Sequence, residues 1–146
     1  MIAMNNGAWL QELAKFLSET TCATSLGGCS DAQLEFHERR LGQSLTPQMR
    51  QFYTRFNGLA PVDASTTIDI WPLDRMEVVT KAGASSVVVF ADFLFCAVEY
   101  AEESHSGAIL IKRVPLDLEL AEDFIDFIKL YQENSPRLRW DGTSQW

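Results

Sequence analysis

The spacing of apolar residues changes near Thr67, and this change constrains the fold more than any other feature of the sequence. Before it, apolar residues recur every three or four positions, as they do along one face of a helix. After it, they alternate with polar residues or form short unbroken runs, which is typical of strands, and helical spacing returns near the end. This order predicts an α+β domain, in which a mainly antiparallel sheet of about four or more strands packs with helices.

Two amphipathic helices are expected in the first part of the chain. Apolar residues at helical spacing predict one helix over residues 8–20. The second begins at Ser30, where Gln33 completes a capping box, and it ends near Leu41 with Gly42 as its C-terminal glycine.

The stretch LTPQMRQFYTRFNG, residues 45–58, carries the signals for a third helix at both of its ends. Thr46 can cap the start, and Pro47 occupies the first helical position, where a missing N–H costs nothing. Asn57-Gly58 tolerates a left-handed exit. Four apolar residues form a single stripe that we expect to be buried: Met49, Phe52, Tyr53 and Phe56.

The strand region is predicted from four segments. A short strand at 68–71 stops at Pro72, and residues 73–83 are interpreted as a short helix or turn. The unbroken apolar run 87–91 suits a strand covered on both faces. Alternation over 94–101 and a further strand over 108–114, joined by a polar turn, predict a hairpin.

The final helix is expected to begin near Asp117 and to end before Pro136. Its broad apolar face indicates burial, and the acids at its start suit the positive end of a helix dipole. Residues 136–146 are interpreted as a tail. The length of 146 residues favours one domain, 1–146, with a core over about 30–132.

Composition excludes several classes of function. The net charge of −8 argues against binding to nucleic-acid backbones. No segment has the roughly 20 apolar residues that a membrane span needs, and the start lacks the positive charge of a signal peptide. Three cysteines, with no C-x-x-C pair, fit reduced thiols and a cytoplasmic location.

Residues that could carry catalysis or bind a metal are isolated. His37 and His105 have no second ligand at metal-site spacing; we expect His105 to be solvated and His37 to be half-buried or exposed. The carboxylates in the stretch 99–103 could serve hydrolysis, although a solvated acidic edge is the simpler interpretation. The sequence therefore predicts no enzyme activity, no cofactor and no metal.

A glycine-containing loop, SLGGCS at residues 25–30, leaves two alternatives open. Its backbone N–H groups could bind an anion, or it could simply connect two helices. Cys29 could have a lowered pKa near the following helix start, although no base is identifiable beside it. Cys96, in an apolar run, is expected to be a small buried residue.

Charge is distributed unevenly along the chain. Residues 39–55 hold four arginines and no acid, whereas residues 92–126 hold nine acids against two basic residues. The acids from 117 to 123 are attributed to the helix dipole. Four other acids, which lie on the expected strands and turn, are candidates for docking a basic protein partner: Asp92, Glu99, Glu102 and Glu103.

Two aromatic residues near these acids have alternative interpretations. Trp71 and Tyr100 could anchor a partner at the centre of an interface, or they could belong to the core.

The segment LGQSLTPQMRQFYTRFNG resembles the signature of the SMI1/KNR4 family, in the SUKH superfamily. In this chain the family's usual Leu-Pro is stretched to Leu45-Thr46-Pro47. IDIWPLDRM is similar to the strand and turn that follow in that family, VVVFADFLFCAVEYA to its central hairpin, and LAEDFIDFIKLY to its closing helix. The resemblance covers about residues 30–132. One departure is ADFLFCA, where many members have a Gly/Asp-rich turn.

The resemblance implies a binding protein, because members are associated with bacterial immunity to toxins and with protein interactions in eukaryotes, and are not known as enzymes. It leads to the hypothesis of a cytoplasmic, bacterial immunity protein that covers the active site of a basic toxin domain, which could be a nuclease. The alternative is a generic regulatory or scaffold module with a cellular protein partner.

Overall fold

The computed structural model describes residues 7–63, 66–80, 86–94, 96–112 and 117–139. The helices of this part are α1 (Ala8–Thr20), α2 (Asp31–Leu41), α3 (Pro47–Arg55) and α4 (Phe124–Glu133), with 3-10 helices η1 (Leu73–Arg75) and η2 (Pro136–Arg139). The strands are β1 (Ala23–Thr24), β2 (Ala60–Pro61), β3 (Asp69–Ile70), β4 (Glu77–Thr80), β5 (Ser86–Phe93), β6 (Val98–Glu103), β7 (Ile109–Ile111) and β8 (Leu118–Ala121).

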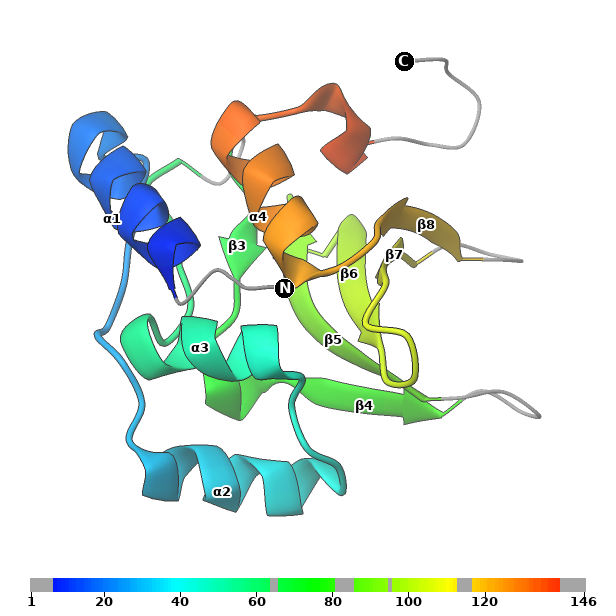
Figure 1. The fold of residues 1–146 in the computed structure, drawn as a ribbon. Coiled ribbons are helices and arrows are strands. Elements are labelled where there is room, and N and C mark those ends of the chain that lie inside the picture. The colour runs from blue at the N-terminus through cyan, green and yellow to red at the C-terminus, as the bar shows by residue number, and fades with distance from the viewer. Residues whose placement is uncertain (1–6, 64–65, 81–85, 95, 113–116, 140–146) are drawn as a thin grey trace.

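The fold class predicted from the sequence is confirmed. A six-stranded sheet has the order β3-β5-β6-β7-β8, with β4 also paired to β5, and every ladder in it is antiparallel. β3 and β4 pair with opposite halves of β5, and η1 connects them. In Figure 1, α1, α3 and α4 gather beside the sheet, and α2 lies beyond α3 at the bottom of the view.

The core forms between the helices and the sheet. Phe52 of α3, Phe90 of β5 and Phe124 of α4 are all fully buried in it. The ring centroid of Phe124 lies 5.2 Å from that of Phe52 and 5.5 Å from that of Phe90. This aromatic contact joins the helical layer to the sheet.

The local signals for the first three helices are confirmed. α1 spans the expected residues, and the Ser30–Gln33 capping box starts α2, which ends at the left-handed Gly42. Thr46 caps α3 by accepting a hydrogen bond from Met49 N, and the apolar stripe of this helix is buried. The residues that determine these helix ends lie within one turn of each end, so the local sequence is sufficient to predict the boundaries.

The left-handed residue expected at Asn57-Gly58 is Gly58, but α3 ends before it, at Arg55. The backbone of Phe56 is already extended, and the side-chain amide oxygen Oδ1 of Asn57 accepts a hydrogen bond of 2.8 Å from Leu73 N. Gly58 has a φ of +84°, and a Cβ there would lie 2.6 Å from the carbonyl oxygen of Ile70. These residues therefore fit the chain against β3.

The prediction of a helix from Asp117 is wrong over its first seven residues. Residues 118–121 form β8, which pairs with β7, and α4 begins only at Phe124 with Asp123 as its N-cap. The apolar residues at 118 and 120 fit the alternation of a strand as well as one face of a helix. The strand forms because the edge of β7 offers backbone groups with which this segment can pair. The dipole explanation for Asp117 and Glu119 is therefore wrong as well.

The hairpin of β6 and β7 is confirmed, with Tyr100 opposite Ile111. Two neighbouring expectations change. Leu94 and Cys96 are not in a strand but in a turn, with φ of 54° and 70°. Residues 73–80 form η1 and then β4, while the expected end at Gly83 lies outside the described residues.

The expected tail begins as part of the fold. Pro136–Arg139 forms η2, and Leu138 within it is 1% exposed in the core. The remainder of the tail, from residue 140, lies outside the described residues.

Replacing Phe52 with alanine should lower the free energy of unfolding by about 3–5 kcal/mol, because it removes a fully buried ring from the contact between the two layers. Chemical denaturation measures this change. Thr54→Ala, at an exposed position of the same helix, is the control and should stay within about 0.5 kcal/mol of the unsubstituted protein. An unchanged midpoint for Phe52→Ala would contradict the prediction.

Candidate functional site

The six residues proposed from the sequence do not form one exposed surface. Four of them are buried: Trp71, Asp92, Tyr100 and Glu102 are 2%, 3%, 0% and 3% exposed. Glu99 and Glu103 are partly exposed, and alternation along β6 places them on the opposite face from Glu102. The prediction of a continuous docking surface made of these residues is therefore wrong.

Asp92 is a structural residue that connects the segment after β3 to the turn after β5. Its Oδ1 accepts a hydrogen bond of 2.6 Å from Trp71 Nε1, and its Oδ2 accepts one of 2.6 Å from Cys96 N. The Arg75 guanidinium lies 4.2 Å from the centre of the Trp71 ring system. Asp92 thereby holds the turn after β5, and Cys96, which was expected to be buried, is exposed there.

Tyr100 belongs to the core between the helices and the sheet, whereas Trp71 belongs to a second buried cluster with Val87, Val89 and Ala101. The packing interpretation therefore holds for both aromatic residues. The Tyr100 hydroxyl donates a hydrogen bond to the Leu138 carbonyl oxygen, and its ring packs against Phe127. This bond attaches η2 to the centre of the sheet.

Glu102 lies in the wall of a hollow of about 450 Å³. The hollow forms where the starts of α3 and α4 meet the turn between β6 and β7, and its lining residues are Thr46, Pro47, Gln48, Glu102, His105, Ser106, Gly107, Glu122 and Asp123. The Thr46 hydroxyl donates a hydrogen bond of 2.9 Å to Glu102 Oε2. We call this the Glu102 hollow.

Burial raises the pKa of Glu102 to about 7, and the negative charge of Asp123 adds to the increase. The hydrogen bond from Thr46 acts in the opposite direction but is weaker. A carboxyl group in a hollow that ionises near neutral pH is the kind of group found at functional sites.

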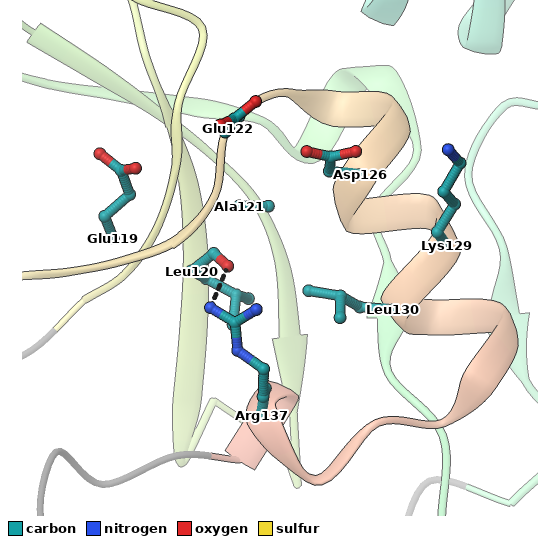
Figure 2. Close-up of a pocket in the computed structure, with 8 residues that line it drawn as sticks. All are labelled: Glu119, Leu120, Ala121, Glu122, Asp126, Lys129, Leu130 and Arg137. Atoms are coloured by element: carbon teal, nitrogen blue, oxygen red, sulfur yellow. Dashed lines mark hydrogen bonds between the residues drawn. The ribbon is translucent and has the colours of Figure 1, made fainter. Parts of the chain in front are cut away.

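A second hollow, of about 530 Å³, lies beside β8 and α4 (Figure 2). Its lining residues are Glu119, Leu120, Ala121, Glu122, Asp126, Lys129, Leu130 and Arg137. Figure 2 shows Arg137 reaching from η2 toward β8, where its Nη2 donates a hydrogen bond of 2.9 Å to the Leu120 carbonyl oxygen. Glu122 lines both hollows, so the two are neighbours on one surface.

This surface, which we call the β8–α4 surface, consists of the two hollows and four acids that line them: Glu119, Glu122, Asp123 and Asp126. Sequence reasoning missed it, because Glu119, Glu122 and Asp123 were assigned to the start of a helix. Two of the four acids do serve the helix: Asp123 Oδ1 accepts a hydrogen bond of 2.9 Å from Asp126 N. Glu119 and Glu122 are exposed and lie before α4. An N-cap signal at Asp123 could have shifted the expected start of the helix.

The glycine-containing loop packs against α3. A Cβ on Gly28 would lie 1.8 Å from the Thr54 carbonyl oxygen, and Cys29 N donates a hydrogen bond of 2.8 Å to the Tyr53 carbonyl oxygen. Burial raises the pKa of the Cys29 thiol, which is opposite to the lowered pKa considered from the sequence. The connecting interpretation of this loop therefore holds.

Neither histidine lies in a metal-binding cluster. Within the residues that the structure describes, no group of three or more His, Cys, Asp or Glu side chains is placed to hold a metal ion. His37 is half-buried on α2, where its Nδ1 accepts a hydrogen bond of 3.0 Å from Arg40 Nε. His105 is exposed in the β6–β7 turn, as expected.

Part of the basic run at 39–55 has structural partners. Arg50 forms an ion pair of 3.1 Å with Glu38, and Arg40 donates hydrogen bonds to the Leu73 and Met76 carbonyl oxygens. Arg39 and Arg55 are exposed.

Comparison with protein-family models finds no matching family, and comparison with curated proteins finds no significant relative. In the described part of the chain, no helix is long and apolar enough to cross a membrane.

The stability of the protein should depend on the ionisation of Glu102. Its pKa is higher in the folded chain than in the unfolded chain, so the folded state holds this proton more tightly. The resulting stabilisation is fully present in acid, below the ordinary pKa of 4.5, and is lost as the pH rises through about 7. The loss should be roughly 3 kcal/mol, and Glu102→Gln should lack it.

Urea denaturation between pH 4 and pH 8 measures this effect as the difference between Glu102→Gln and the unsubstituted protein. Glu99→Gln, which removes a half-exposed carboxylate from the same strand, is the matched control. A constant difference in unfolding free energy across this range would contradict the raised pKa.

Proposed function

We propose that this protein is a non-enzymatic protein-binding domain, and that the β8–α4 surface binds a basic region of its partner. The observation that carries the proposal is the pair of adjoining hollows that share Glu122 and are lined by further acids. Concave acidic surfaces concentrate the field of their charges and attract basic partners.

The distribution of charge at this surface supports the direction of the proposal. Four acids line the two hollows, in addition to the buried Glu102. Lys129 is exposed, whereas Arg137 reaches inward to the Leu120 carbonyl oxygen and contributes to holding η2 against β8. The net charge of −8 for the whole chain acts in the same direction at longer range.

The proposed partner is a toxin domain, and the protein is a cytoplasmic immunity protein of bacterial type. This part of the proposal is supported by the motifs in which the chain resembles the SMI1/KNR4 family. Binding would neutralise the toxin by covering a basic active-site cleft, such as that of a nuclease. A regulatory or scaffold module that uses the same surface for a cellular protein is the alternative, and the identity of the partner distinguishes the two.

Reversing the charge of two exposed acids, in the double variant Glu119→Lys/Glu122→Lys, should slow association with the partner about tenfold at low salt. The difference should shrink at high salt, because ions screen exposed charges over roughly 8 Å at physiological ionic strength. Affinity capture with mass spectrometry first identifies the partner, and association kinetics at two salt concentrations then measure the rates.

Two further variants make this experiment specific. Glu12→Lys/Glu19→Lys changes the net charge equally, at exposed positions of α1, and should leave most of the association rate intact. Glu99→Lys/Glu103→Lys tests the acids on the other face of β6. Equal rates for Glu119→Lys/Glu122→Lys and the unsubstituted protein at low salt would exclude the β8–α4 surface, and a loss in the β6 variant would identify that face.

A further inference from the structure

Glu102 is a buried carboxylate whose partner in the structure is uncharged. The ion pairs among the described residues are Arg50–Glu38, Arg75–Asp69 and Arg75–Asp92, and none of them involves Glu102. Its Oε2 accepts the hydrogen bond from Thr46, while Oε1 accepts none from the described residues. Only 3% of the residue is exposed, and it faces the hollow. Buried carboxylates are normally paired with a cation, so the hollow lacks a positive group.

Three backbone N–H donors at the two helix starts beside this hollow already have side-chain acceptors. Met49 N donates to Thr46 Oγ1, Ile125 N to Gln48 Oε1 and Asp126 N to Asp123 Oδ1. The Gln48 amide nitrogen in turn donates a hydrogen bond of 3.2 Å to Asp123 Oδ2. These bonds use three of the donors that would otherwise attract an anion, and the carboxylates that line the hollow favour a cation instead.

We propose that the Glu102 hollow receives one arginine side chain of the partner protein, with the guanidinium against the Glu102 carboxylate and within reach of Asp123 and Glu122. This inference rests on the proposed function, because it names the group that the β8–α4 surface recognises. Pro47 and Gly107 supply uncharged walls for the methylene groups of the side chain.

Arginine suits this site better than lysine for two reasons. A guanidinium is more weakly hydrated than an ammonium, so it costs less to bring beside a buried carboxylate. It also presents five N–H donors in one plane, which can serve Glu102 and a second acid together. A single arginine that fills a pocket at the centre of an interface is a common hot spot of binding.

Binding at this site should strengthen as the pH rises. The guanidinium requires ionised Glu102, and the pKa of this group is raised to about 7 by burial. The ionised fraction therefore increases about tenfold between pH 6 and pH 8, and the affinity increases with it. The other titratable groups that face the hollow are Glu122, Asp123 and His105. The variant His105→Gln, which lacks the imidazole beside the hollow, isolates the contribution of Glu102.

The test is an NMR titration of the full chain, labelled with nitrogen-15, using N-acetyl-argininamide as the probe. The lysine analogue controls for charge alone, and the citrulline analogue controls for shape without charge. We expect saturable shifts at the amides of Thr46, Ser106 and Gly107, and affinity about tenfold higher at pH 8 than at pH 6. Glu102→Gln should weaken binding at pH 8 at least tenfold and remove most of the pH dependence of binding. His105→Gln should keep this pH dependence.

The proposal would be overturned if the citrulline or the lysine analogue bound as tightly as the arginine probe. It would also be overturned if the shifts at these amides did not saturate, or if Glu102→Gln bound the arginine probe as tightly as the unsubstituted protein. If Glu102→Gln does not fold, the pH dependence measured in His105→Gln decides, and a flat profile overturns the proposal.

The outcomes also separate this inference from the proposed function. If Glu119→Lys/Glu122→Lys slows association with the partner but Glu102→Gln does not, the arginine site alone is overturned. If the arginine probe binds specifically but the charge reversal does not change the rate of association with the partner, the arginine site is supported and the proposed docking of the partner is overturned.

Discussion

The position of α3, which contacts both α4 and the segment after β3, determines both the core and the hollow at its end. Phe52 packs against Phe124 of α4, while the Tyr53 hydroxyl donates a hydrogen bond of 2.6 Å to the Trp71 carbonyl oxygen at the end of β3. Because these neighbouring residues point to different layers, the helix has little freedom to rotate or slide. Its first turn is thereby fixed against β6, with the Thr46 hydroxyl beside Glu102.

The elements that could be predicted from the sequence are those whose signals are local. Ser30 and Thr46 cap helices through atoms no more than three residues away, and both helices begin where expected. β8 could not be found in the same way, because its partner is the edge of β7, and pairing with another strand produces no pattern within the segment itself. The wrong start of the last helix then led to a wrong interpretation of the acids before it.

The candidate site was predicted only in part, because burial of a polar residue is decided by partners that are distant in the sequence. Trp71 lies 21 residues from Asp92, and Thr46 lies 56 residues from Glu102. Glu102 was chosen as part of an exposed acidic cluster, yet strand alternation separates it from Glu103, and it joins Glu122 and Asp123 instead. The sequence therefore indicated Glu102 as a candidate, but it did not indicate the burial or the neighbours that the structure gives this residue.

The burial of Glu102 gives the free protein an energetic cost that binding could remove. A methionine or leucine at this position would avoid an unpaired buried carboxylate, and Thr46 could cap α3 without a partner on β6. A positive group beside Glu102 would lower its raised pKa, so a bound arginine would restore the stability that ionisation removes near neutral pH. Binding and folding would then be linked through the Glu102 carboxyl group. The partner would therefore stabilise the folded state by more than its contacts with exposed residues around the hollow provide. The Thr46–Glu102 hydrogen bond would carry this linkage, because it connects the start of a core helix to the wall of the hollow.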